Sequence, residues 1–130
     1  MIGTLPSFDV ALVLRVGGDV VYSCGNVDRA FPLASVTKPI VAWSVLVAVE
    51  RGLISLDDPA GPEGATVRHL LAHASGLPFE GRRPVAAPGK RRIYSNEGFD
   101  ILGEVVAEAS GMGVAQWVRQ TVFDPLGMGS

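Results

Sequence analysis

A ten-residue apolar run at positions 40–49 constrains the fold of this chain more than any other stretch. Apolar side chains occur all round this run, and Pro39 precedes it, where a proline fits the first turn of a helix. A helix that is apolar on every side needs cover on every side, so the run predicts a central helix that ends near Arg51. The run is far shorter than the roughly 20 residues of a membrane-spanning helix, and we expect no membrane span.

The segment before this helix predicts a β-hairpin. Residues 10–16 and 20–24 read as two strands around a turn at residues 17–19, Gly-Gly-Asp. The first strand is apolar almost throughout, which is typical of a strand covered on both faces. Two strands alone are marginal in water and leave open edges. We therefore expect additional strands, a packed helix, self-association, or a partner at the open edge of the hairpin.

The rest of the chain predicts three more helices. One covers residues 67–74 and is capped by Thr66, the next follows Asn96 and ends near Gly111, and the last is stopped by Pro125. The order of elements, a hairpin followed by helices, predicts an α+β fold.

The bulk composition limits the class of protein. The 130 residues, 48% hydrophobic and 18% charged, fit one modest domain with a packed core. The net charge of −2 indicates no basic face, so we expect no nucleic-acid partner. Cys24 is the single cysteine and cannot form an internal disulfide, and the first residues lack the pattern of a secretory leader. These features favour a cytoplasmic location.

Two histidines and a basic stretch are weaker signals. His69 and His73 are four positions apart, a possible metal-ligand spacing, but no third ligand is evident and we expect structural or solvent-facing roles. Residues 80–92 are rich in Pro, Gly and Arg, and we expect a solvated loop there rather than a docking patch for anions.

Ser35 and Lys38 are the first candidates for chemistry. They lie three positions apart at the start of the central helix, close to one helical turn, so their side chains can lean to the same side. A serine hydroxyl becomes a good nucleophile when a neighbour takes its proton. A neutral lysine amine can do so, and burial and a helix N-terminus favour that form. In the alternative, Ser35 only caps the helix and Lys38 is a solvated side chain.

Tyr94 and Asn96 form the second candidate group. A tyrosine held near a lysine ammonium has its pKa lowered and can shuttle a proton. An asparagine two residues later offers a donor and an acceptor to a substrate amide or ester. The structural alternative is a turn in which Ser95 or Asn96 caps the following helix.

These residues resemble a known family. Residues 35–38, Ser-Val-Thr-Lys, and 94–96, Tyr-Ser-Asn, are similar to the first two motifs of the serine β-lactamase and penicillin-binding-protein superfamily. The tyrosine in the second motif resembles the branch of class C β-lactamases, D-aminopeptidases and esterases. Residues 70–78, 88–89 and 123–128 also resemble that branch, so the likeness covers nearly the whole chain in the right order.

The resemblance implies a fold and a set of roles. The fold would be β-lactamase/transpeptidase-like, with one partial domain made of a hairpin at residues 1–26 and a helical region at residues 34–130. Ser35 would be the acylated nucleophile, with its own backbone N–H as half of an oxyanion hole, and Lys38 would activate it. Tyr94 would take and return the proton, and Asn96 would orient Lys38 and the substrate.

The same resemblance implies the ligands. The substrate would be a small-molecule β-lactam, a D-amino-acid peptide or an ester, and neither a metal nor an organic cofactor is implied.

The sequence departs from the pattern of the family in one respect, which concerns its length and its third motif. Its members are longer, and their later strands carry a third motif of the Lys/His-x-Gly type and a second oxyanion N–H. No such motif follows Tyr94 here, so we expect the N-terminal part of a serine hydrolase, truncated and weakly active alone. Losing one oxyanion donor typically lowers the rate about 100- to 1,000-fold. The alternative is a non-catalytic fragment or binding relic of the same fold.

Overall fold

The computed structural model describes residues 9–129 of the chain. The chain divides into two compact units, residues 1–33 and residues 34–130. The first unit holds two strands and the second holds the helices, as the sequence predicted for an α+β fold. The expectation about a leader at the start of the chain falls on residues 1–8, outside the described residues.

The first unit is an antiparallel hairpin of β1 (Ala11–Val16) and β2 (Asp19–Gly25). Gly17 and Gly18 both have positive φ, 59° and 95°, which is the conformation of a tight two-residue hairpin turn. Asp19 pairs with Val16 and so begins the second strand instead of ending the turn. The predicted hairpin is therefore confirmed, with the second strand one residue longer at its start.

The apolar side chains of this hairpin are exposed on both strands. Leu12, Leu14, Val16, Val20 and Val21 are all at least partly open to solvent. Within the described residues of the hairpin unit, 9–33, the sheet has two strands and nothing in that unit supplies the expected cover on both faces of the first strand. Both strands therefore present an open edge.

The second unit begins with a short 3₁₀ turn, η1 (Ala34–Val36), that leads directly into α1 (Thr37–Glu50). The helix is apolar all round, but in the described structure it is covered mainly on one side. Val45 and Ala48 are fully buried, whereas Trp43 is 59% exposed. Within the described residues of the helical unit, 34–129, the prediction of cover on every side is therefore wrong, because the later helices pack along a single face of α1.

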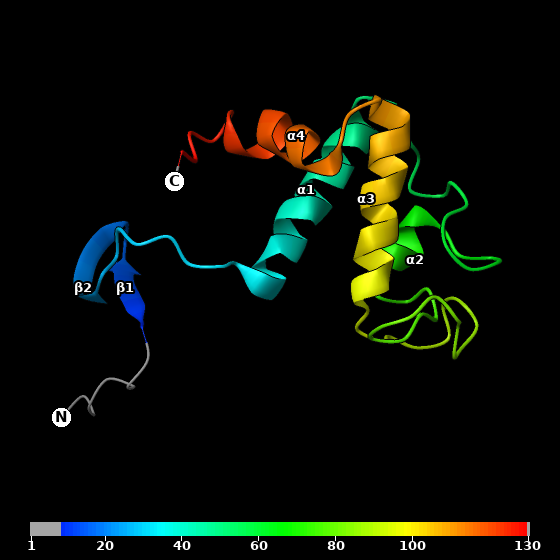
Figure 1. Ribbon diagram of the computed structural model, residues 1–130, viewed down its shortest axis with the longest axis horizontal. Helices are drawn as coiled ribbons and strands as arrows, with labels where there is room; N and C mark the ends of the chain where they lie inside the picture. Colours follow the sequence, from blue (N-terminus) through cyan, green and yellow to red (C-terminus); the bar gives the residue numbers. More distant parts are fainter. Residues whose placement is uncertain (1–8, 130) are drawn as a thin grey trace. The chain divides into compact units, whose positions relative to one another are not determined.

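The helix α3 (Asn96–Ser110) is the second long helix of this unit. Its N-cap is Ser95, whose Oγ accepts a hydrogen bond from the Gly98 N–H at 3.1 Å. Its C-cap is Gly111, in the left-handed conformation at φ 68°. In Figure 1, α1 and α3 lie next to each other and run in the same direction, so their N-termini lie at the same end of the unit.

The short helix α2 (Val67–Leu71) packs against α3, and it ends three residues earlier than predicted. His73 has φ 56°, which is incompatible with a continued right-handed helix. His73 therefore lies in the loop after α2, and the four-residue spacing from His69 does not place the two rings on one helix face.

The helix α4 (Val114–Val118) continues into the π-helical turn η2 (Arg119–Phe123) and closes the unit. The indole N–H of Trp117 donates to the backbone carbonyl of Ser44 at 3.0 Å, which ties α4 to α1. The core comprises Val45, Ala48, Ile54, Val67, Leu70, Leu77, Ile101, Leu102, Val106 and Trp117.

Within residues 9–129 the structure has no helix with the length and apolar character required to cross a membrane.

Candidate active site

The helices α1 and α3 run in the same direction, and their N-terminal ends bring together residues that are far apart in the sequence. Ser35 lies in η1, immediately before α1, and Lys38 lies in the first turn of α1. Tyr94 precedes the N-cap of α3, and Asn96 is the first residue of that helix. The N-terminal ends of both helices carry partial positive charge, so this end of the unit favours negative charge.

Ser35 and Tyr94 are in direct contact. The Tyr94 hydroxyl donates a hydrogen bond to Ser35 Oγ at 2.7 Å, across 59 positions of sequence. The expectation that the Tyr94 hydroxyl would come within hydrogen-bond reach of Ser35 or Lys38 is met. Both side chains are open to solvent, and Tyr94 is 39% exposed. A substrate can therefore approach the bonded pair from solvent.

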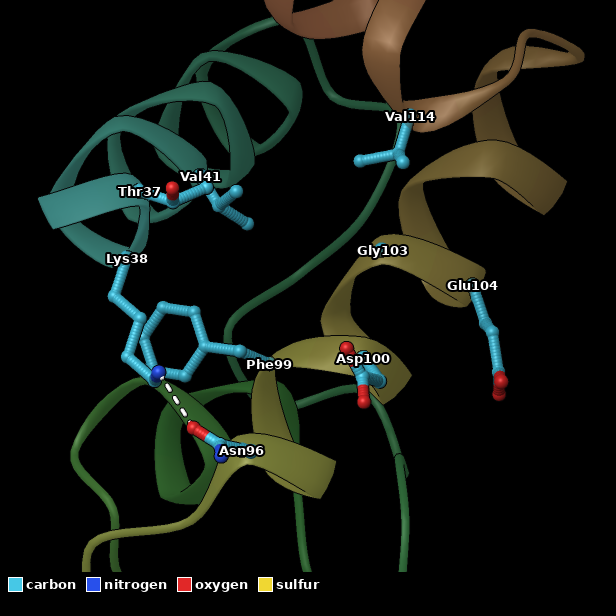
Figure 2. Close-up of a pocket in the computed structure, with 9 residues that line it drawn as sticks. All are labelled: Thr37, Lys38, Val41, Asn96, Phe99, Asp100, Gly103, Glu104 and Val114. Atoms are coloured by element: carbon cyan, nitrogen blue, oxygen red, sulfur yellow. Dashed lines mark hydrogen bonds between the residues drawn. The ribbon is translucent and has the colours of Figure 1, made fainter. Parts of the chain in front are cut away.

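Lys38 is held by Asn96. Lys38 Nζ donates to Asn96 Oδ1 at 2.7 Å, the bond drawn as a dashed line in Figure 2. The ammonium also lies 4.8 Å from the centre of the Tyr94 ring and 5.8 Å from that of Phe99. Cation–π attraction to these rings adds to the hydrogen bond. The position of Lys38 is thus defined by α3 and by the loop that precedes it.

This arrangement changes the acidity of the Tyr94 phenol. Hydrogen bonding with Lys38, and then with Ser35, lowers the pKa of Tyr94 from its ordinary value of 10.0, and the positive charge of Lys38 acts in the same direction. Once it is deprotonated, the Tyr94 oxygen can accept a proton from the Ser35 hydroxyl that it contacts.

A set of backbone hydrogen bonds holds the Tyr94 loop in place. The Ile93 N–H donates to the carbonyl of His73 at 2.7 Å, and the Asn96 N–H donates to that of Phe79 at 2.9 Å. The Ser95 N–H donates to the ring nitrogen Nδ1 of His73 at 3.1 Å. The loop after α2 therefore positions the segment that carries Tyr94 and Asn96.

A pocket of about 590 Å³ borders the bond between Lys38 and Asn96. Figure 2 shows Lys38 and Val41 of α1 on one side, and Asn96, Phe99 and residues of the next α3 turn on the other. Ser35 and Tyr94 are not among the lining residues, so the pocket opens beside Lys38 rather than over the serine hydroxyl. The full lining is Thr37, Lys38, Val41, Asn96, Phe99, Asp100, Gly103, Glu104 and Val114.

The two histidines have partners of their own. His69 Nδ1 pairs with the hydroxyl of Thr66 at 3.0 Å, and His73 Nδ1 accepts from Ser95. Across the described part of the chain, no three His, Cys, Asp or Glu side chains come together as a metal site would require.

The basic loop at residues 80–92 is partly paired to α3. Arg82 forms ion pairs with Glu97 and Glu104, and hydrogen bonding with Arg82 lowers the pKa of the Glu104 carboxyl. Arg82 is therefore engaged within the unit and does not present its charge freely to an anionic partner.

His73 has a structural role, one of the two alternatives that the sequence predicts for it. It is buried and contacts three consecutive residues around Tyr94, a connection that the sequence pattern does not indicate. Its positive φ is the reason: the backbone turns at His73 and carries the ring toward the start of α3. The stretch His-Ala-Ser-Gly at residues 73–76 follows a helix and is rich in turn-forming residues, so it is the sequence feature that indicates a change of chain direction here.

Comparisons with known proteins show what the chain as a whole is similar to. A family model described as beta-lactamase matches residues 8–130. A solved β-lactamase structure from Mycobacterium bovis is 50% identical, with a TM-score of 0.82 over 85% of this chain and 41% of that chain. The esterase EstB of Burkholderia gladioli is 35% identical, over 78% of this chain and 38% of the esterase. A penicillin-binding protein of Bacillus subtilis is 28% identical, over 98% of this chain and 38% of the relative. The chain thus spans 38% to 41% of the length of these relatives.

Proposed function

The chain belongs to the β-lactamase family, whose members are serine hydrolases, and from that premise we propose that Ser35 is the nucleophile of an acyl-transfer site. The family and the β-lactamase/transpeptidase-like fold predicted from residues 35–38 and 94–96 are confirmed. The roles of the individual residues are our proposal. The observation that carries it is the 2.7 Å hydrogen bond between Tyr94 and Ser35 Oγ.

In the first step, Ser35 Oγ attacks the carbonyl carbon of the substrate while its proton passes to the Tyr94 oxygen, which reacts as the phenolate. The carbonyl C–O π bond opens to an oxyanion near the start of α1, where the Ser35 backbone N–H and the helix dipole stabilise negative charge. Collapse of this intermediate breaks the bond to the leaving group. Tyr94 returns the proton to the leaving nitrogen or oxygen.

The second step is hydrolysis of the acyl-serine ester. Tyr94 takes a proton from a water molecule, whose oxygen attacks the ester carbonyl, and the Ser35 oxygen leaves with that proton. Lys38 supports both steps, because its charge favours the phenolate form of Tyr94. Asn96 holds Lys38 through Oδ1, and its amide N–H₂ remains able to donate to a substrate carbonyl.

For the substrate we propose a small molecule with an ester, a β-lactam or a D-amino-acid amide bond. The names of the relatives support this range, because they include an esterase, a β-lactamase and a D-alanyl-D-alanine carboxypeptidase. All three bonds place a carbonyl carbon next to a leaving oxygen or nitrogen. The chemistry at Ser35 is the same in each case.

Covalent labelling of Ser35 is a sharper test than turnover, because it requires only the nucleophile and the groups that activate it, and not the later hydrolysis step. The chain would be incubated with a fluorophosphonate and, separately, with a penicillin, and the adduct located by peptide mass spectrometry. We expect one adduct, on Ser35, and none in Ser35→Ala. The matched control is Ser55→Ala, which removes an exposed serine remote in sequence from both motifs and should leave labelling unchanged.

The outcome also separates the two classes of function. A penicilloyl adduct on Ser35 that is then hydrolysed supports the hydrolase, and a stable phosphonyl adduct on Ser35 supports its role as the nucleophile. A folded chain that is not labelled by either reagent would contradict the proposal and favour a binding relic of the same fold.

We also propose self-association through the hairpin. The open edges of β1 and β2 and their exposed valine and leucine side chains support it. Sedimentation velocity tests this directly: Val13→Lys on β1 should shift the chain toward monomer. A wild-type chain that sediments as a monomer even at high concentration would contradict this proposal.

A further inference from the structure

His73 is the residue of this region that the proposed chemistry does not use. It is 7% exposed and lies in the loop after α2. Its φ of 56° is a conformation that histidine adopts more readily than most residues but that is uncommon in folded chains. A backbone held in such a conformation at a site edge is a reason to ask what the side chain does there.

Three separate contacts join His73 to three consecutive residues. Its backbone carbonyl accepts from the Ile93 N–H at 2.7 Å, and its ring Nδ1 accepts from the Ser95 N–H at 3.1 Å. Between these two bonds, its ring stacks on Tyr94 with centroids 4.6 Å apart. One residue therefore holds the backbone on both sides of Tyr94 and also the Tyr94 ring.

The hydrogen bond that the Ser95 N–H donates to His73 shows which nitrogen of the imidazole ring carries the proton. Nδ1 accepts an N–H, so it carries no proton of its own, and the ring is the neutral tautomer with its hydrogen on Nε2. If a proton were added to Nδ1, two hydrogen-bond donors, Nδ1–H and the Ser95 N–H, would point at each other. The bond would be lost, and a positive charge would appear beside Lys38.

The surroundings of the ring disfavour that charge. Lys38 of α1 and Arg92 of the loop before Tyr94 are the cations that act on it, and α3 presents the apolar ring of Phe99 at 5.1 Å. Tyr94 is the titratable side chain in direct contact with the ring. Burial, followed by Arg92 and Lys38, lowers the pKa of His73.

We propose that neutral His73 positions Tyr94 for proton exchange with Ser35, and that protonation of His73 releases Tyr94 and switches the site off. This inference rests on the proposed function, because it assigns a positioning role within the same site. The hydrogen bonds and ring contacts of His73 that bear on the site go to the loop around Tyr94 and to Phe99, and none of them goes to Ser35. It acts through the loop that carries Tyr94.

The test uses the rate at which a fluorophosphonate phosphonylates Ser35, a reaction in which Ser35 Oγ loses its proton to Tyr94 and fluoride leaves from phosphorus, measured from pH 4 to pH 9. A phenolate base alone makes the rate fall about tenfold per pH unit on the acid side of the Tyr94 pKa. Protonation of His73 displaces Tyr94 and lowers the labelling rate by a further factor of about ten per pH unit. Below the pKa of His73 we therefore expect the wild-type rate to fall by about 100-fold per pH unit, which appears as a second bend in the profile. His73→Asn retains a side-chain acceptor and tolerates positive φ, and it should be slower at pH 8 and lack the extra bend.

The chain offers a matched control, because it has two histidines. His69→Asn removes the other imidazole, whose partner is Thr66, and should keep both the rate and the bend. If His73→Asn retains the wild-type bend, or if His69→Asn loses it, the inference is overturned.

A second measurement does not depend on reactivity or on a variant. The two histidine Cε1–H signals and the Tyr94 ring signals are followed by NMR against pH in the wild-type chain. We expect the Tyr94 ring signals to shift with the same midpoint as His73, below pH 6.5. Tyr94 signals that stay constant while His73 titrates would contradict the inference, even if Ser35 is acylated. Absence of acylation in a chain that shows the coupled shift would contradict the proposed function and leave the positioning role supported.

Discussion

The ammonium of Lys38 donates a hydrogen bond to Asn96 Oδ1 at 2.7 Å and so joins the first turns of α1 and α3. Without this bond, Lys38 can leave the Tyr94 ring that it faces at 4.8 Å. Hydrogen bonds to charged groups contribute about 1.5–3 kcal/mol, so we expect Asn96→Ala to slow covalent labelling of Ser35 by about 10- to 100-fold. Fluorophosphonate labelling rates at pH 8 measure this. Asn26→Ala, in the hairpin unit, should leave the rate unchanged, and an unaltered rate in Asn96→Ala would show that the bond is not needed.

The two tyrosines should titrate in separate steps. Hydrogen bonding with Lys38 and Ser35 lowers the pKa of Tyr94 below its ordinary 10.0, whereas hydrogen bonding with Cys24 raises the pKa of Tyr22 above it. Absorbance at 295 nm against pH reports tyrosinate directly. We expect Tyr94→Phe to remove the lower step and Tyr22→Phe to remove the upper one. A single step at pH 10 in both variants would contradict the environment described for Tyr94.

Lowering the pH should destabilise the helical unit through His73. Burial first, and then Arg92 and Lys38, lowers the pKa of His73 below its ordinary value of 6.5, so the unfolded chain binds this proton more readily than the folded chain. The stability that neutral His73 contributes is therefore fully present above pH 6.5 and is lost as the pH falls toward the folded-state pKa. Urea melts between pH 4 and pH 8 should show this loss, and His73→Asn should flatten the curve. His69→Asn serves as the control and should follow the wild-type curve.

Gly76 should be essential for the loop that positions Tyr94. It has φ 86°, and a Cβ there would lie 2.0 Å from the Ala86 carbonyl oxygen. Gly64 has φ 78° with open space around it. Gly64→Ala should therefore cost only the left-handed conformation, about 1–2 kcal/mol, whereas Gly76→Ala should cost about 1–3 kcal/mol more from overpacking. Thermal melts compare the two, and equal losses of stability would contradict the close approach at Gly76.

The two tryptophans should differ sharply in their contribution to stability. Trp117 is 2% exposed and donates its indole N–H to the Ser44 carbonyl, whereas Trp43 is 59% exposed on α1. We expect Trp117→Ala to cost about 3–5 kcal/mol and Trp43→Ala to change the free energy of unfolding by about 0.5 kcal/mol or less. Urea melts followed by circular dichroism measure both. A loss at Trp43 as large as that at Trp117 would mean that α1 has cover on its exposed side in solution.

Several features of the fold followed from local pattern. The two glycines at positions 17 and 18 can both adopt positive φ, so the hairpin and its turn could be predicted from the sequence. Leu102 and Val106 of α3 are four positions apart, a spacing that places them on one face of a helix, and both are buried. Such features depend on neighbours in the sequence.

Other features of the fold could not be predicted from the local sequence, because they depend on contacts between residues far apart in the chain. The helix at residue 67 was predicted to reach residue 74 and ends at Leu71, because His73 adopts positive φ to meet Ile93 and Ser95. Either Ser95 or Asn96 could cap α3 by residue type. Ser95 does so, because the Asn96 side chain is taken by Lys38.

The sequence alone determined which residue types could carry the chemistry, since the motifs at 35–38 and 94–96 could be recognised by their order and spacing. Only the tertiary structure decided how they meet. Parallel packing of α1 and α3 brings Tyr94 to Ser35 and Asn96 to Lys38. The His73 contacts then hold the Tyr94 loop in that place. The physical reason is that hydrogen bonds and ring stacking act over a few ångströms, so residues nearly sixty positions apart interact only after the chain between them has folded.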